Sequence, residues 1–500
     1  MMSKNTDKKR EQLHIISMED LVPRDHLLRL IEASIDWNFI YELVEDKYSH
    51  ETGRPSMDPV MLIKIPIIQY TYGIRSMRQT IKEIEVNVAY RWFLGLDMFD
   101  KVPHFSTFGK NYSRRFKDSS LFEQIFSKIL EECYKNKLID ASTVFIDATH
   151  VKAHANSKKI QKQIASDEAL FYEEQLKKEI NQDRIAHGKK PFEEKNESKD
   201  DKDNDNDEEH KDGSGYGASQ SNMKSSHSKF PKEIKASTTD PESGWFRKGE
   251  HKHVFAYAVQ TACDRNGWIL NYSIHPGNLH DSRTFEAIYR KIENIGIKTL
   301  VADAGYKNPA IAKLLIDSDI TPVLPYKRPM TKQGYFRKSE YVYDEYYDCY
   351  ICPNNKLLEY STTNKNGYRE YKSKGYVCAK CPDINKCTGS KNNVKLVIRH
   401  LWENYLERCE DIRHTLGMKE IYALRKETVE RVFANAKENH GFRYTNMKGK
   451  ARMQMKVGLT FACMNLKKLA KFIQKINGLK RPFSIKFNIK YTVSVCGVQN

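Results

Sequence analysis

Two aspartates follow short apolar segments that have the composition of buried strands. Asp147 comes directly after Val144 to Ile146, and Asp303 comes directly after residues 299–302. Continuous β-branched and apolar runs of this length are typical of strands that are buried on both faces. Carboxylates at strand ends can converge, and a hard cation such as Mg²⁺ prefers oxygen ligands. Taken singly, each aspartate is better explained as a turn residue or a helix cap.

A third carboxylate is expected from a helix that packs on the same sheet. Residues 425–437 carry apolar side chains at helical spacing, which mark a buried stripe at Val429, Val432, Phe433 and Ala436. Glu430 lies roughly 110° from the centre of that stripe, whereas Glu427 lies about 170° away and faces solvent. Glu430 is therefore the better candidate. Lys426 and Lys437 lie on the same flank as Glu430, a spacing that is also typical of salt bridges on a surface helix.

Three such carboxylates could hold a pair of divalent ions that promotes an in-line displacement at a phosphate. The charge of the chain agrees with a phosphate-bearing partner. The 500 residues include 83 Lys and Arg against 65 Asp and Glu, which gives a net charge of +18 and a pI near 9.2. Residues 193–212 contain 11 acidic residues and four Lys, a net of −7, so the rest of the chain carries +25. An excess of this size favours nucleic acid over other partners.

Five cysteines fall within about 40 residues of one another in a Tyr-rich segment. They form two Cys-x2-Cys pairs and one further residue: Cys349, Cys352, Cys378, Cys381 and Cys387. Two such pairs predict a tetrahedral zinc site. The gap of 25 residues between the pairs is longer than usual, and Cys387 is a surplus ligand. The alternative is a set of reduced thiols in a loop.

The elements that would position these residues fall into two or three domains, because 500 residues exceed one ordinary core. Helical periodicity predicts an all-helical domain over residues 20–130. Its basic clusters suggest a DNA-binding face, with phosphate contacts expected from Arg75, Arg78, Arg114 and Arg115. The alternative is an ordinary solvated helix face.

The region after residue 140 predicts a mixed α/β sheet with helices packed against it. Its strands and helices follow the order strand, strand, strand, helix, strand, helix, strand, with a hairpin turn at residues 264–267. Asp281 is expected to cap the first of these helices. The predicted segments are a disordered stretch at 1–19, the helical domain at 20–130, the first catalytic part at 140–327, a polar disordered insertion at 157–231 with a helical stretch at 165–180, the Cys-rich insertion at 328–410, a helical catalytic part at 411–478 and a tail at 479–500.

The residues also resemble those of a known family. The segments that carry the resemblance are Val-Phe-Ile-Asp-Ala-Thr-His at 144–150, Pro-Gly-Asn-Leu-His-Asp-Ser at 276–282, Val-Ala-Asp-Ala-Gly-Tyr at 301–306, Glu-Thr-Val-Glu-Arg-Val-Phe at 427–433, and Arg-Pro-Ser-Met-Asp-Pro at 54–59. Together they resemble bacterial insertion-sequence transposases of the DDE type. This resemblance implies an RNase H-like catalytic domain, dependence on Mg²⁺ or Mn²⁺, and the triad Asp147, Asp303 and Glu430. It also implies that Lys437 contacts DNA near the cleavage site.

One part of the motif departs from that family. In many relatives a Tyr and an Arg precede the Glu at fixed spacing, whereas this chain has Ala423 and Lys426 at those positions. Lys426 is therefore the expected DNA contact beside Glu430.

The expected function is a DNA transposase that binds terminal inverted repeats, cleaves DNA with metal-activated water and joins the 3′-hydroxyl to target DNA. Bringing two ends together requires a dimer or a larger assembly. The alternatives are a nuclease of the same fold without strand transfer, and a non-enzymatic DNA-binding regulator. No secretory signal and no stretch of about 18 uncharged apolar residues is found, so a cytoplasmic protein without a membrane partner is expected.

Overall fold

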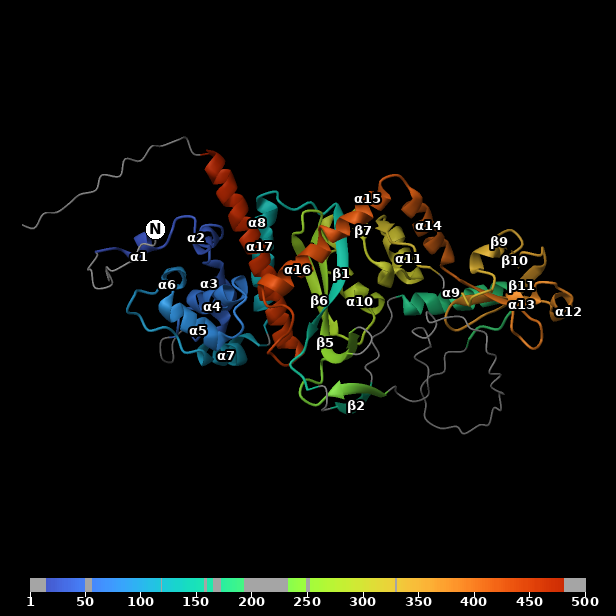
Figure 1. Cartoon of the computed structure of the whole chain (residues 1–500), viewed down its shortest axis with the longest axis horizontal. Coiled ribbons are helices and arrows are strands. Elements are labelled where there is room, and N and C mark those ends of the chain that lie inside the picture. The colour runs from blue at the N-terminus through green and yellow to red at the C-terminus, as the bar shows by residue number, and fades with distance from the viewer. Residues whose placement is uncertain are drawn as a thin grey trace, which may run out of the picture. The chain divides into compact units, whose positions relative to one another are not determined.

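The computed structural model describes residues 15–49, 56–117, 119–156, 160–164, 172–192, 233–248, 252–328 and 331–480. These residues form two compact units (Figure 1). One contains the described residues up to Leu138, together with Glu438–Gly441 and the helical residues from Gln454. The other contains Ile139–Lys437 and Phe442–Met453. Each unit is described by itself.

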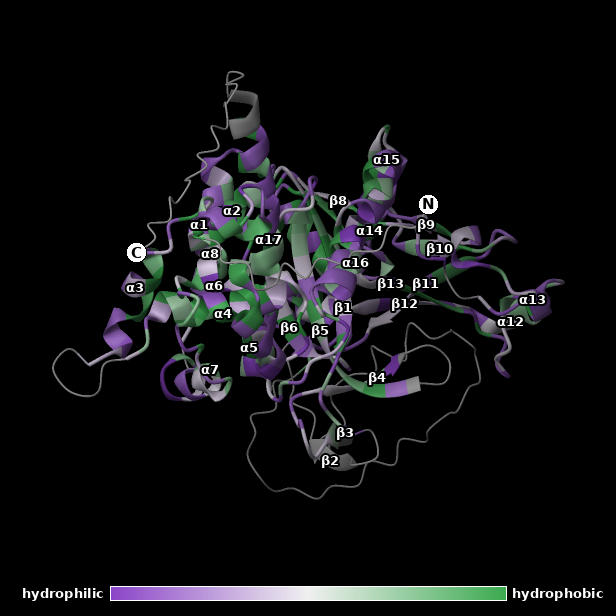
Figure 2. Cartoon of the chain, turned by 60° about the vertical axis from the view of Figure 1, so that its left-hand side comes forward, coloured by the Kyte–Doolittle hydropathy of each residue, from purple (hydrophilic) through white to green (hydrophobic). Residues whose placement is uncertain are grey.

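The first unit is all-helical. Its helices are α1 (Met18–Leu21), α2 (Leu27–Glu32), α3 (Phe39–Val44), α4 (Pro59–Thr71), α5 (Met77–Val86), α6 (Val88–Leu94), α7 (Ser106–Asn111), the π-helical turn η3 (Tyr112–Phe116), α8 (Leu121–Lys135) and most of α17 (Lys450–Lys480). Asp58 begins α4, because its carboxylate accepts a hydrogen bond from the Val60 amide and Pro59 suits the first helical position. Almost every later residue of α4 is buried, and Figure 2 shows its hydrophobic composition. It is therefore a central core helix.

The C-terminal part of α17 belongs to this helical unit, whereas the sequence suggests that residues 411–478 form part of the catalytic domain. Its residues from Val457 to Ala470 are largely buried, and the Cys463 thiol lies 3.6 Å from the Ile67 carbonyl oxygen of α4. The His440 Nδ1 atom also donates to the Tyr70 carbonyl at 2.7 Å. Both contacts join residues far apart in the sequence, which periodicity cannot reveal.

The second unit is built on a mixed sheet with the order β2-β3-β4-β5-β1-β7-β8, and β6 pairs with β5. Its strands are β1 (Thr143–Lys152), β2 (Ile160–Ile164), β3 (Glu233–Ser237), β4 (Gly244–Lys248), β5 (Lys252–Asp264), β6 (Ile269–Pro276), β7 (Thr299–Val301) and β8 (Thr321–Val323). Strand β1 is antiparallel to β5 and parallel to β7, and β7 is parallel to β8. The predicted mixed sheet is confirmed.

The predicted hairpin joins β5 to β6. The Asp264 carboxylate accepts hydrogen bonds from the amides of Asn266 and Trp268, and Gly267 has a φ of 73°. Asp favours such side-chain-closed turns, and glycine adopts this left-handed conformation without strain.

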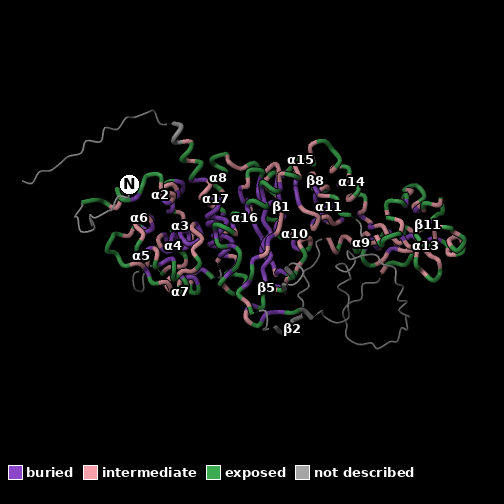
Figure 3. Tube along the Cα trace, viewed as in Figure 1, coloured by how far each residue is buried: buried purple, intermediate pink, exposed green. Residues whose placement is uncertain are grey.

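Each face of the sheet carries its own core, because alternate residues of a strand point to opposite faces. On one face Val144, Ile146 and Leu300 pack with α10 (Asp281–Tyr289), α11 (Pro309–Asp317) and α14 (Glu403–His414). On the other, Phe145 and Val301 pack with α15 (Met418–Ala423) and α16 (Val429–Asn439). Figure 3 shows the buried central strands.

The Cys-rich segment folds into a second, five-stranded sheet with the order β13-β12-β11-β10-β9. Its elements are β9 (Val342–Asp344), β10 (Cys349–Ile351), β11 (Leu357–Thr363), β12 (Tyr368–Ser373), α12 (Gly375–Cys378), α13 (Ile384–Cys387) and β13 (Leu396–His400). We call residues 336–400 the cysteine module. Its small core consists of Tyr341, Tyr350, Leu358, Tyr371 and Val397.

The polar insertion predicted over 157–231 contains regular structure. Strand β2 and helix α9 (Glu173–Ala186) fall within it, and residues 193–232 lie outside the described residues. Ile180 and Asp183 of α9 are buried. The prediction of disorder is thus wrong for β2 and for the part of α9 after residue 180. The helical stretch expected at 165–180 agrees with α9 from Glu173 onward, and residues 165–171 lie outside the described residues.

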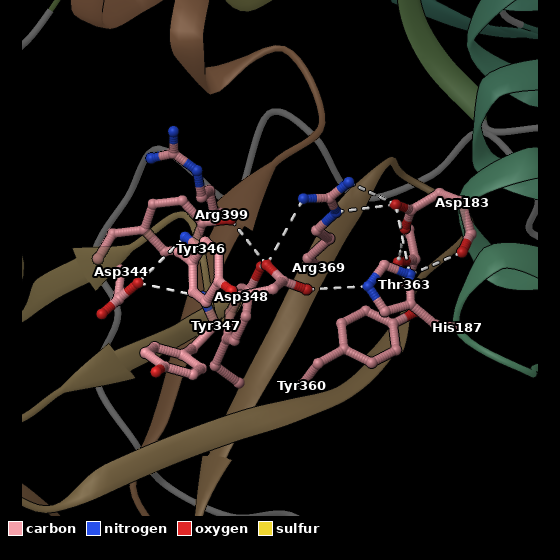
Figure 4. Close-up of polar contacts among 12 residues, drawn as sticks. Asp183, His187, Asp344, Tyr346, Tyr347, Asp348, Tyr360, Thr363, Arg369 and Arg399 are labelled. Atoms are coloured by element: carbon pink, nitrogen blue, oxygen red, sulfur yellow. Dashed lines mark hydrogen bonds and ion pairs between the residues drawn. The ribbon is translucent and has the colours of Figure 1, made fainter.

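A polar network attaches α9 to the cysteine module (Figure 4). The Asp183 carboxylate accepts hydrogen bonds from Arg369 and Thr363, and the His187 ring contacts the Asp348 carboxylate at 2.8 Å. Although burial alone would raise the pKa of Asp348, hydrogen bonds from Tyr371, a second tyrosine and His187 hold it below its usual range. The polar side chains of α9 are therefore held by residues about 180 positions away in the sequence. The polar sequence of α9 by itself does not indicate these contacts.

No helix among the described residues is both long and apolar enough to cross a membrane.

Candidate active site

The first two predicted carboxylates lie at equivalent positions on neighbouring parallel strands. Phe145 of β1 is in register with Val301 of β7, so Asp147 and Asp303, each two residues further on, follow on the same face. The Asp147 carboxylate accepts a hydrogen bond from the Ala148 amide at 2.8 Å. Asp303 caps the 3₁₀ turn η5 (Ala304–Tyr306) by accepting from the Gly305 amide at 2.6 Å.

Glu430 enters from α16, the helix that covers this face of the sheet. Its neighbour Val429 is fully buried against Phe145 and Val301, while Glu430 itself is exposed in the first turn. Burial raises the pKa of Asp147, and the charges of Asp303 and Glu430 raise it further. Asp303 and Glu430 are therefore both within electrostatic reach of Asp147.

A buried arginine that is not among the predicted site residues contacts Asp147. The Arg425 guanidinium donates to the Asp147 carboxylate at 2.8 Å and to the Tyr422 hydroxyl at 3.1 Å. Its Nε atom has no hydrogen-bond partner within the described chain. Burial would lower the pKa of Arg425, but the nearby charge of Asp147 stabilises the charged guanidinium. The net result is a raised pKa.

A Tyr and an Arg do occur one residue before the positions of Ala423 and Lys426. Tyr422 and Arg425 keep the spacing of two intervening residues, with one extra residue before Glu430. The 3₁₀ turn η7 (Leu424–Lys426) between α15 and α16 accommodates that residue and directs Arg425 inward, whereas Lys426 is exposed. The structure therefore places Arg425, and not Lys426, against the Asp147 carboxylate.

A fourth carboxylate lies close to the second. His280, and not Asp281, caps α10, because its Nδ1 atom accepts from the Ser282 amide at 3.2 Å. An added Cβ on Gly305 would lie 2.9 Å from an Asp303 oxygen and 3.8 Å from an Asp281 oxygen. Burial, Asp303 and Asp147 raise the pKa of Asp281 to about 6. The predicted capping role of Asp281 is wrong, and its side chain extends the acidic group.

The chemistry of these donors suits a hard divalent cation. Carboxylate oxygens are the ligands that Mg²⁺ prefers, and a cationic guanidinium already pairs with Asp147. Within the described ranges, no three Asp, Glu, His or Cys side chains already stand close enough together to hold an ion. The acids that could hold one are Asp147, Asp303 and Glu430.

The remaining predicted site residues lie on other elements. Lys437 is half-buried near the end of α16. In the helical unit Arg75 precedes α5, and Arg78 lies in its first turn with its guanidinium 4.4 Å from the centre of the Phe105 ring. Arg114 and Arg115 lie in the π-helical turn η3, which follows α7 directly. All but Arg115 and Lys437 are exposed.

Two family models match the chain. A transposase domain (DUF772) matches residues 16–114, and a transposase DDE domain matches residues 351–470. Together the two matches support an insertion-sequence DDE transposase. The first match covers α1 to α7, and the second includes Arg425 and Glu430. A DDE domain implies an RNase H-like fold. No curated protein and no solved structure matches the chain.

Proposed function

We propose that this transposase cleaves DNA at the ends of its element and joins the resulting 3′-hydroxyl to target DNA. The observation that supports this function is the grouping of Asp147, Asp303 and Glu430, from two strands and one helix, on a single face of the sheet. The substrates would be the terminal inverted repeats and target DNA, bound by a dimer or larger assembly, because two ends must be joined together.

The three acids would hold Mg²⁺ or Mn²⁺, which when bound activates water or a hydroxyl and stabilises the leaving oxygen. Arg425 orients the Asp147 carboxylate through its hydrogen bond at 2.8 Å. Asp281 adds negative charge beside Asp303 at the end of β7. Lys426 and Lys437, which flank Glu430 on its helix and the preceding turn, would contact the phosphates of the bound DNA.

Strand transfer separates this function from its alternatives. We expect the purified protein to join pre-cut element ends to a target plasmid in Mg²⁺, and to lose both cleavage and joining in excess chelator. Ca²⁺ should support assembly without chemistry, because it binds oxygen ligands with looser geometry. Cleavage without joining would indicate a nuclease, and DNA binding without any metal-dependent cleavage would indicate a regulator.

The basic helices are proposed to contact DNA phosphates. Each true contact that is replaced by Ala should reduce the slope of log K against log salt by about one unit and weaken binding to all sequences similarly. The test variant replaces Arg75, Arg78, Arg114 and Arg115 together, and binding is measured by fluorescence anisotropy over a salt series. Lys128 and Lys135 of α8, which already pair with Glu131 and Glu132, give a matched control. An unchanged slope in the quadruple variant would show that these helices bind something else.

A further inference from the structure

Four of the five clustered cysteines line one cavity of the cysteine module. The cavity has a volume of about 410 Å³ and is bordered by the thiol-bearing residues Cys352, Cys378, Cys381 and Cys387. They come from three places: the turn after β10, the end of α12 with the residues after it, and the end of α13. All four are free thiols. Sulfur atoms from separate segments of the chain therefore line the same cavity.

Cys349 does not belong to this group, although it forms the first Cys-x2-Cys pair with Cys352. Side chains alternate along β10, so Tyr350 and Cys352 share one face and Cys349 points to the other. Tyr350 and Cys352 both contact the module core. Cys349 is buried on its strand, opposite Asp344 and Glu359 of the neighbouring strands, and does not line the cavity.

Two of the four sulfur atoms accept hydrogen bonds from amide groups, and the Cys378 thiol donates one to the Ser373 hydroxyl at 3.2 Å. The Lys356 amide donates to the Cys352 sulfur at 3.3 Å, and the Asn354 side-chain amide donates to the Cys381 sulfur at 3.1 Å. Asn354 is itself held by Asp383 at 3.2 Å. Donors of this kind orient metal ligands and stabilise their charge. Lys356, Lys380 and Lys395 also border the cavity.

The segment that carries three of these cysteines contains two short helices with no buried side chains. Neither α12 nor α13 buries a single residue, and each is only four residues long. The core of the module contains five buried side chains, against which Cys352 and Cys387 pack. Small modules with a limited core commonly depend on a structural metal or a disulfide.

We propose that Cys352, Cys378, Cys381 and Cys387 bind one structural Zn²⁺, and that Cys349 takes no part. Sulfur ligands select zinc over the hard cations that carboxylates prefer. The four thiols each release a proton as four Zn–S bonds form in a tetrahedral arrangement. Among the described residues, no three metal-binding side chains are already placed to hold an ion, so a bound zinc would have to bring the turn, α12 and α13 closer together. This site is independent of the proposed DNA chemistry.

The test is the zinc content of the full chain, purified without chelator and measured by plasma mass spectrometry. We expect about one Zn²⁺ per chain, and loss of that zinc in each of Cys352→Ser, Cys378→Ser, Cys381→Ser and Cys387→Ser. Cys349→Val is the matched control, because valine suits a buried strand position, and it should retain one Zn²⁺. Absence of zinc from the parent protein would overturn the site. Zinc that survives Cys387→Ser but is lost in Cys349→Val would overturn the choice of ligands.

Cobalt provides a second measurement that does not depend on the folding of a variant. Co²⁺ added to the metal-stripped parent should give the strong thiolate charge-transfer absorption and the visible bands of a tetrahedral site, and Zn²⁺ should displace it. The same spectrum is expected for Cys349→Val. A spectrum typical of six oxygen ligands, or no spectrum, would contradict a four-sulfur site whether or not the protein cleaves DNA.

Discussion

Replacing Asp147, Asp303 or Glu430 by Ala is expected to abolish both cleavage and strand transfer while leaving DNA binding largely intact. Each acid is proposed to position metal at the scissile phosphate, and none is proposed to hold the DNA itself. We expect a loss of at least about 10³-fold for each, because removal of even one preorganised electrostatic group costs roughly 10²–10³-fold. The rates of both reactions on end-sequence duplexes, with binding measured in parallel, provide the test.

Glu427 supplies the control for that experiment. It lies in the turn before α16, three residues from Glu430, and is exposed. Glu427→Ala should therefore retain activity near that of the parent. An inactive Glu427→Ala beside an active Glu430→Ala would show that the third carboxylate has been placed on the wrong residue.

Strands β1 and β7 could be predicted from sequence because their signals are local. The run Val144 to Ile146 is β-branched and aromatic, as is typical of a buried strand, and an Asp follows it directly. The stripe through Val429 and Phe433 likewise identified the buried face of α16, which packs on Phe145. In both cases the side chains that decide the structure lie within a few residues of the acid.

The features that sequence did not reveal depend on turns and on distant partners. Arg425 lies in the 3₁₀ turn η7 and contacts Asp147. In a 3₁₀ turn the side chains point in different directions from those in a continuous α-helix. Asp281 is a strong capping residue by type, yet His280 takes the cap and leaves Asp281 near Asp303. The face of β10 that Cys349 occupies is likewise set by strand register, which spacing between cysteines does not encode.

Arg425→Met is expected to destabilise the second unit most strongly when no divalent cation is present. The Arg425 and Asp147 side chains are only 8% and 17% exposed, so their ion pair is largely shielded from water. Removing one partner of a buried pair leaves an uncompensated charge, which costs roughly 3–5 kcal/mol. A divalent cation held by the three acids would compensate Asp147 in place of the guanidinium. The loss of thermal stability should therefore be larger in chelator than in Mg²⁺.

The direction of the pH dependence follows from the same pair. Burial already raises the pKa of Asp147, and without the Arg425 charge the hydrogen bond from the Ala148 amide is left to oppose that rise. A carboxyl whose pKa is raised on folding stabilises the native state at low pH, and this contribution is lost as the pH rises through the folded pKa. The stability deficit of Arg425→Met should accordingly grow from acid to neutral pH.

Lys426→Met is the matched control, because it removes a positive charge at the next position, where the side chain is exposed. Exposed substitutions of this kind usually change stability by no more than about 0.5 kcal/mol. Thermal unfolding of the parent and both variants, in chelator and in Mg²⁺ across the acid-to-neutral range, distinguishes the roles of the two residues. If Arg425→Met is as stable as Lys426→Met in chelator, the ion pair does not hold Asp147 in place. Equal losses with and without Mg²⁺ would mean instead that no cation takes over the charge of Arg425 at this carboxylate.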